Sequence, residues 1–99
     1  MIRTVLIAAT MFGFSNAALA QGKEAECRKQ GQIATDIMSQ RKAGANAKRA
    51  TAQVIGKLPE DARNYESAIP ALVEWIYSLP EEQMTPEVSN ALYQVCLSQ

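Results

Sequence analysis

The segment IPALVEWIY, residues 69–77, decides the fold of this chain. Its apolar residues recur at positions i, i+3, i+4, i+7 and i+8, the spacing of one face of an α-helix. They are Ile69, Leu72, Val73, Ile76 and Tyr77. Pro70 suits the first turn of this helix, with Ser67 as the expected N-cap, and Leu79-Pro80 ends it. The pattern predicts a helix that packs against the core.

The sequence that follows predicts another helix, which begins after Thr85 and ends near Leu97. Thr85 is the expected N-cap and Pro86 occupies the first helical position, where a missing backbone N–H costs nothing. Its apolar face comprises Val88, Ala91, Leu92, Val95 and Cys96. We expect Leu92 and Val95 to be among the most buried residues, together with Ile69, Leu72, Val73 and Ile76.

Upstream of the quoted segment, the pattern predicts two more helices, over residues 23–43 and 47–57. Gly44 suits the position after the first, and Asn46 is a plausible N-cap for the second. Residues 59–66 are polar and turn-like, with room for one helical turn. Four helices with short connections predict an all-α fold, either an up-down-up-down four-helix bundle or an orthogonal helical array.

The two cysteines, Cys27 and Cys96, lie near the start of the first predicted helix and the end of the fourth. An up-down-up-down bundle brings these two helix ends together. We therefore expect one intramolecular disulfide between Cys27 and Cys96, with Cα atoms roughly 4.4–6.8 Å apart. A small domain has a limited core, so such a bridge is expected to stabilise it substantially.

Residues 1–20 have the pattern of a cleavable secretory signal peptide. Arg3 provides the positive charge, residues 4–14 form an apolar run, and Ala18-Leu19-Ala20 is a small-x-small cleavage motif. The run is too short to span a bilayer, so we expect no stable membrane insertion after cleavage. The sequence thus predicts cleavage after Ala20, a single helical domain over residues 21–99, and a location in the periplasm or outside the cell, where disulfides persist.

The residues that most often perform catalysis or bind metal are missing from this sequence. There is no histidine, no glycine-rich phosphate loop, and only two cysteines, which are expected to pair with each other. The acidic pairs Glu60-Asp61 and Glu81-Glu82 are expected to be solvated charges. We therefore expect a protein that is not an enzyme and that uses no metal or cofactor.

Charge is distributed unevenly along the chain. Residues 21–58 contain eight basic and three acidic residues, whereas residues 59–99 contain one basic and seven acidic residues. The basic residues are dispersed and lack aromatic neighbours, which argues against nucleic-acid binding. Trp75 lies off the main apolar face of its helix, so it is either a core residue or part of a partner surface. The candidate partner surface comprises Trp75, Glu81, Glu82 and Glu87.

Several positions together resemble small exported helical proteins of Gram-negative bacteria that contain one disulfide and have no assigned activity. These positions are Cys27, Gly31, Arg41, Gly44, Trp75-Ile76-Tyr77, Thr85-Pro86 and Tyr93-x-x-Cys96. The resemblance implies an exported helical domain. We expect a non-catalytic binding or interaction module, such as an inhibitor, an immunity protein or an envelope accessory protein, with a protein partner whose identity the sequence leaves open.

An alternative is a periplasmic chaperone that responds to acid or other stress. In its general plan the chain is similar to periplasmic acid-stress chaperones, which are small, helical and bridged by one disulfide. It departs from them because its cysteines lie at the extreme ends of the domain. With no histidine, any acid switch would depend on carboxylates and act below about pH 5.

Overall fold

A computed structural model describes the backbone of residues 7–99 and the side chains from Gly22 onward. The described chain is helical and contains no β-strand. Its elements are α1 (Ile7–Lys42), α2 (Ala47–Gly56), the 3₁₀ helix η1 (Glu60–Ala68), α3 (Ile69–Ser78), the 3₁₀ helix η2 (Glu81–Gln83) and α4 (Pro86–Leu97). The predicted all-α fold is confirmed.

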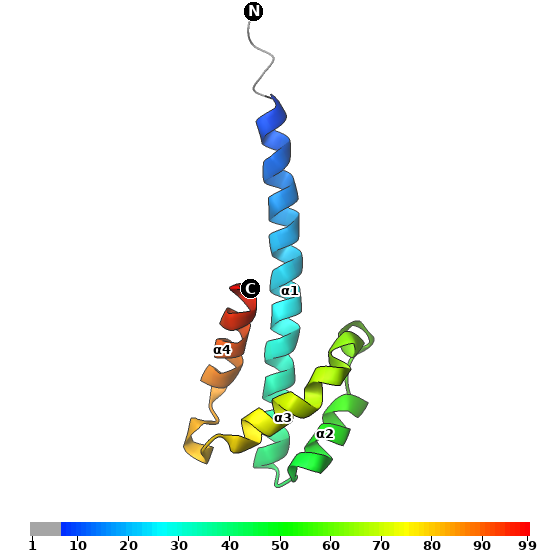
Figure 1. Cartoon of the computed structure of the whole chain (residues 1–99), viewed down its shortest axis with the longest axis vertical. Helices are drawn as coiled ribbons and strands as arrows, with labels where there is room; N and C mark the ends of the chain where they lie inside the picture. Colours follow the sequence, from blue (N-terminus) through cyan, green and yellow to red (C-terminus); the bar gives the residue numbers. More distant parts are fainter. Residues whose placement is uncertain (1–6) are drawn as a thin grey trace, which may run out of the picture.

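The long helix α1 is the element against which the other helices pack (Figure 1). Helix α4 runs antiparallel along one side of α1, while α2 and α3 pack together near the C-terminal end of α1. Helix α3 crosses α1 obliquely, and it makes little direct contact with α4. The result is a small helical bundle that is less compact between α3 and α4 than elsewhere.

Helix α1 begins much earlier than the predicted residue 23. Its backbone is helical from Ile7, so part of the predicted signal segment continues the helix, and the first six residues of that segment lie outside the described residues. Its C-terminal end is close to the prediction. The helix ends at Lys42, and Gly44 has a φ of 95°, a conformation that glycine adopts with little strain.

Two of the three predicted N-caps are confirmed. The Asn46 side chain accepts a hydrogen bond from the Arg49 backbone N–H at 2.8 Å, and Thr85 Oγ1 accepts one from the Glu87 N–H at 3.3 Å. The prediction of Ser67 as the cap of α3 is wrong, because α3 follows directly from η1 and its N-cap residue is Ala68. The preceding 3₁₀ turns leave no free helix start for Ser67 to cap.

The core lies between α1, α2 and α3. Its buried residues are Ile33, Ala34, Ile37, Met38, Ala50, Val54, Leu58, Ala62, Ile69, Val73, Ile76 and Met84. The predicted burial of Ile69, Val73 and Ile76 is confirmed. The prediction for Val95 is wrong, since this residue is 53% exposed, and Leu72 and Leu92 are only half-buried. Because α4 packs against α1 and hardly contacts α3, the face of α4 that a compact bundle would bury stays open.

Three kinds of contact hold α4 against α1. Cys27 and Cys96 form the predicted disulfide, with their Cα atoms 5.5 Å apart. At Gly31, a Cβ atom would lie 3.3 Å from the Ser89 backbone oxygen, so glycine permits a close approach of the two helices. The hydroxyl groups of Thr35 and Ser89 share a hydrogen bond of 2.7 Å.

Arg41 joins the end of α1 to the end of α3. Its Nη1 donates hydrogen bonds to the backbone oxygens of Ile76 and Leu79, each at 2.8 Å. These oxygens belong to the last turn of α3 and the residue after it, where helix carbonyls lack intrahelical partners. The guanidinium also lies 5.5 Å from the centre of the Tyr77 ring, and the Tyr77 hydroxyl donates to the Ala45 oxygen at 2.6 Å. Burial raises the pKa of Tyr77, and the charge of Arg41 opposes this rise.

Candidate functional site

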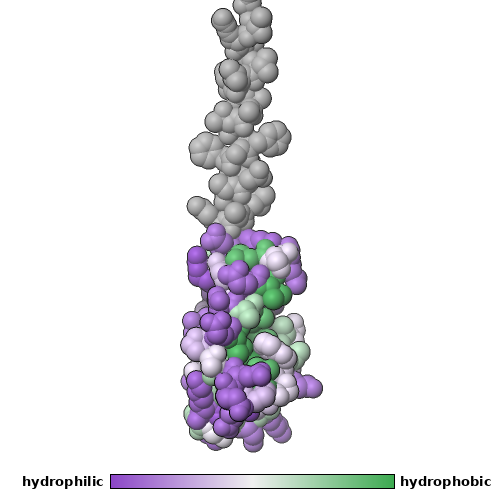
Figure 2. All heavy atoms as spheres, turned by 90° about the vertical axis from the view of Figure 1, so that its left-hand side faces the viewer, coloured by the Kyte–Doolittle hydropathy of each residue, from purple (hydrophilic) through white to green (hydrophobic). Residues whose placement is uncertain are grey.

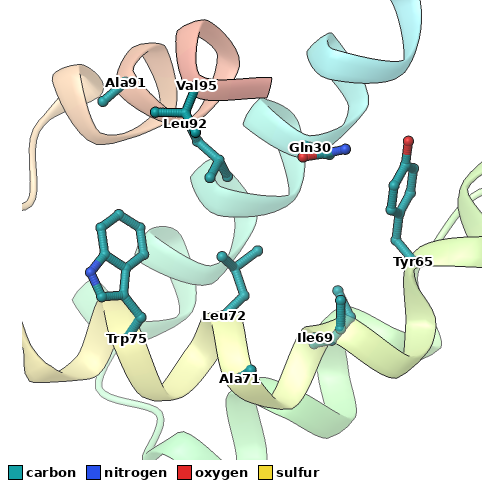
Figure 3. Close-up of a pocket in the computed structure, with 10 residues that line it drawn as sticks. Gln30, Tyr65, Ile69, Ala71, Leu72, Trp75, Ala91, Leu92 and Val95 are labelled. Atoms are coloured by element: carbon teal, nitrogen blue, oxygen red, sulfur yellow. The ribbon is translucent and has the colours of Figure 1, made fainter. Parts of the chain in front are cut away.

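An apolar groove of about 620 Å³ lies between α3 and α4 (Figure 3). Helix α1 contributes one residue to it, and η1 contributes two. The residues that line the groove are Gln30, Tyr65, Ala68, Ile69, Ala71, Leu72, Trp75, Ala91, Leu92 and Val95. Its volume falls within the roughly 300–1,000 Å³ of typical ligand sites, and its lining is mostly apolar, as in such sites.

The groove forms because two apolar helix faces meet at an angle and do not close on each other. On the η1 and α3 side, the lining residues recur at three- and four-residue intervals from Tyr65 to Trp75. On the α4 side, the same spacing brings Ala91 and Val95 to one face. The Leu72, Trp75 and Leu92 side chains point toward the space between the helices (Figure 3).

Large apolar side chains are exposed in the groove. Trp75 is 43% exposed and Val95 is 53% exposed, and they are the two exposed large hydrophobic residues in the described part of the chain. Both line the groove. The face of the molecule that carries α4 shows a band of hydrophobic surface with hydrophilic surface beside it (Figure 2). A contiguous apolar patch bordered by polar residues is typical of an interaction site.

Two polar side chains line the groove. The Tyr65 hydroxyl donates a hydrogen bond of 2.6 Å to Glu26 Oε1, so this tyrosine is held in place by α1. Within the described residues, the Gln30 side chain makes no hydrogen bond, although it lines the groove. Its amide can therefore donate to and accept from an occupant.

The carboxylate that holds Tyr65 belongs to a small charged cluster at the side of the groove. Lys29 Nζ donates to Glu26 Oε2 at 2.9 Å and also lies 3.5 Å from an Asp61 carboxylate oxygen. The hydrogen bonds from Lys29 and then from Tyr65 lower the pKa of Glu26, and the bond to Glu26 raises the pKa of Lys29. All three charges are thus paired, and the Lys29–Asp61 contact joins the basic and acidic halves of the sequence.

The structure separates the predicted partner-surface residues into two groups. Trp75 lines the groove. Glu87 does not line it, but lies one helical turn before Ala91, a lining residue of the same helix. Glu81 and Glu82 are exposed in η2, between α3 and α4, and do not line the groove. In the described part of the chain, no three histidine, cysteine or acidic side chains gather as a possible metal site.

Of the ten lining residues, only Trp75 was predicted from the sequence as a candidate site residue. Five others were assigned to apolar helix faces, namely Ile69, Leu72, Ala91, Leu92 and Val95, and four were given no role, namely Gln30, Tyr65, Ala68 and Ala71. Tyr65 lies seven residues before Leu72, so the apolar period of the 69–77 helix continues upstream into the segment interpreted as a turn. That period was a usable signal for Tyr65 and Ala68. For Gln30 there was none, because its role depends on which side of α1 the other helices leave open.

No protein family model, curated protein or solved structure matches this chain. Among the described residues, no helix is both long enough and apolar enough to cross a membrane. Fold and site together define a small all-α domain with one disulfide and an open apolar groove.

Proposed function

We propose that this protein is a non-catalytic binding module that engages a protein partner through the groove between α3 and α4. The observation behind the proposal is that Trp75 and Val95, exposed large hydrophobic residues on two different helices, line the same groove. Exposed apolar surface costs roughly 25 cal/mol per Å², so a partner that covers it gains that free energy.

The chemistry of the lining favours binding over reaction. The ten lining residues include no carboxylate, amine or thiol, and Tyr65 is their one ionisable side chain. Its hydroxyl is already engaged with Glu26. Apolar side chains with a free amide, Gln30, suit the recognition of a partner surface.

We further propose that the module acts outside the cytoplasm. The support is the signal-peptide pattern of residues 1–20 together with the Cys27–Cys96 disulfide, which is compatible with an oxidising compartment. The intact mass of the protein recovered from its native compartment should correspond to a chain that begins at Gln21. A full-length chain in the soluble cytoplasmic fraction would contradict the export proposal.

Photo-crosslinking from within the groove tests the binding proposal. A photoreactive p-benzoylphenylalanine is placed at Ala91, which lines the groove, and as a control at its neighbour Asn90, which is exposed and does not line it. In intact cells, position 91 should give a discrete adduct that position 90 lacks. The adduct should disappear when Leu92→Asp introduces a charge into the groove.

Two results would contradict specific binding of a partner at position 91. One is the absence of any adduct from position 91 in a protein that circular dichroism shows to be folded. The other is the same set of adducts from positions 90 and 91, which would indicate random collision. An adduct that survives Leu92→Asp would place the contact outside the groove.

A further inference from the structure

The two helices that form most of the groove lie in a segment without basic residues. From residue 64 to residue 99 the chain contains no lysine or arginine. The same segment contains five acidic residues, Glu66, Glu74, Glu81, Glu82 and Glu87. The surface around the apolar lining on α3 and α4 is therefore negatively charged.

Two of these acids lie one helical turn from a residue that lines the groove. Glu74 follows Ala71 by three residues on α3, and Glu87 precedes Ala91 by four residues on α4, so each is next to a lining residue on its helix surface. Both are exposed. No hydrogen bond or ion pair of the described residues engages either carboxylate, whereas Glu66 pairs with Arg63 at 3.3 Å.

Two cations of α1, Lys29 and Lys23, are already engaged with other groups. Lys29 is bound by Glu26 and Asp61, and Lys23 Nζ donates to the Gln99 backbone oxygen at 2.8 Å. Glu74 and Glu87 thus have no cationic partner in the described part of the chain, and each lies beside the apolar lining on a different helix, α3 or α4. An occupant with positive charges along both edges of an apolar face would pair with them.

We propose that the occupant of the groove is a basic amphipathic helix of a protein partner, an inference that rests on the proposed binding function. The lining of η1 and α3 extends from Tyr65 to Trp75, roughly 15–20 Å at 1.5–2.0 Å per residue. That length accommodates apolar side chains at positions i, i+3 or i+4, and i+7 of a docked helix. Lysine or arginine residues beside this apolar face then approach Glu74 and Glu87.

The same observations disfavour two other occupants. An anionic amphiphile, such as a fatty acid, would place its carboxylate among acidic residues, where like charges repel. A second copy of this chain could offer exposed large hydrophobic residues of its described part only through its own groove, since Trp75 and Val95 are both there. Pairing two grooves would bring Glu74 and Glu87 against the same acids of the other copy.

Trp75 is the only tryptophan of the chain, so its fluorescence reports on the groove directly. The probes are two capped helical peptides of about 18 residues with the same leucine face. The polar face of one contains only lysine and arginine, and that of the other only glutamate. The basic peptide should shift Trp75 emission to the blue with saturation, and should bind at least about tenfold more tightly than the acidic peptide at low salt.

Charge reversal tests the assignment of the two glutamates. The double variant Glu74→Lys plus Glu87→Lys should reverse the preference between the peptides. The control is Glu81→Lys plus Glu82→Lys, which changes the net charge equally in η2, away from the lining, and should keep the preference for the basic peptide. Far-UV circular dichroism verifies that all variants are folded.

The other outcomes would contradict the charge preference, the basic-helix occupant or the kind of occupant, as follows. Equal binding of both peptides would overturn the charge inference and leave the groove as a binding site. If neither peptide affects Trp75 while position 91 still crosslinks to a partner, the basic-helix inference fails and the binding function stands. If dodecanoate but neither peptide shifts Trp75 emission, the occupant is an amphiphile and the inference is wrong. The inference is also wrong if the protein self-associates and Val95→Lys abolishes this, because the occupant is then a second copy.

Discussion

Trp75 of α3 and Val95 of α4 line one groove from different helices, although the apolar patterns of both helices predict a shared core. The disulfide explains how the arrangement persists. Cys96, next to Val95, is bonded to Cys27 of α1, so α4 is held to α1 rather than to α3. The apolar face of α4 therefore stays available on the side of α3.

Truncation of a core side chain should lower the free energy of unfolding much more than truncation of a side chain that lines the groove. Ile76→Ala removes a fully buried side chain and should lower the free energy of unfolding by about 2–5 kcal/mol. Val95→Ala, at a residue that is 53% exposed, should change it by no more than about 0.5 kcal/mol. Denaturant unfolding measures both. A loss at Val95 as large as that at Ile76 would mean that α4 packs against α3 in solution.

Arg41 should matter more for stability than its neighbour Lys42. Arg41→Gln removes the guanidinium that donates to the Ile76 and Leu79 oxygens, and should cost about 1–3 kcal/mol because charged donors make the stronger hydrogen bonds. Lys42→Gln removes an exposed charge one position later and should cost less than about 0.5 kcal/mol. Equal melting temperatures of the two variants would show that the contact of Arg41 with α3 contributes nothing.

Reduction of the disulfide should destabilise the domain by about 2–5 kcal/mol, because the bridge closes a loop with a sequence separation of 69 residues. The double variant Cys27→Ser plus Cys96→Ser should show the same loss without a reducing agent. Iodoacetamide should modify the native protein only after reduction, and then at two sites. Modification before reduction would show that the thiols are free.

Glu26 should make stability depend on pH in the acidic range. Its folded-state pKa is lowered, first by the hydrogen bond from Lys29 and then by that from Tyr65. A lowered pKa stabilises the fold above the ordinary carboxylate pKa, and that stabilisation is lost as pH falls through the folded-state value. The Glu26→Gln variant should therefore melt at a lower temperature than the wild type at pH 7. At pH 2.5 the two proteins should have similar melting temperatures. A difference that is the same at both pH values would contradict this assignment.

The same acid titration distinguishes a binding module from the chaperone alternative. An acid-conditional chaperone would lose its near-UV circular dichroism and bind a hydrophobic dye strongly below about pH 5. A binding module with an open apolar groove should bind the dye already at neutral pH, while it is folded. The Leu92→Asp variant should lose this dye binding. A protein whose dye binding appears only with acid unfolding would favour the chaperone.

Local signals in the sequence predicted much of the fold. Asn46 and Thr85 cap helices because their side chains accept from backbone N–H groups within three residues, an interaction that needs no tertiary context. Gly44 ends α1 for a similarly local reason. The Cys27–Cys96 bridge could be predicted because the chain has only two cysteines and the helix order brings them together.

The position of α4 relative to α3 could not be predicted in this way. Helical periodicity identifies an apolar face that includes Leu92 and Val95, but it does not specify whether another helix covers that face. In the structure this face is partly covered, because Leu92 is half-buried, whereas no helix of the described residues covers Val95, which is 53% exposed. The site is thus the part of the molecule where the pattern predicts burial and the packing does not provide it.

The most direct test of the groove as a binding site is a methyl and indole NMR titration of the disulfide-bonded protein with the basic helical peptide. The resonances of Leu72, Leu92, Val95 and the Trp75 indole should shift with one common dissociation constant. The methyl groups of Val54 and Leu58, which lie in the core and do not line the groove, should stay unchanged. Unchanged groove resonances at saturating peptide, or shifts confined to residues outside the groove, would contradict the account.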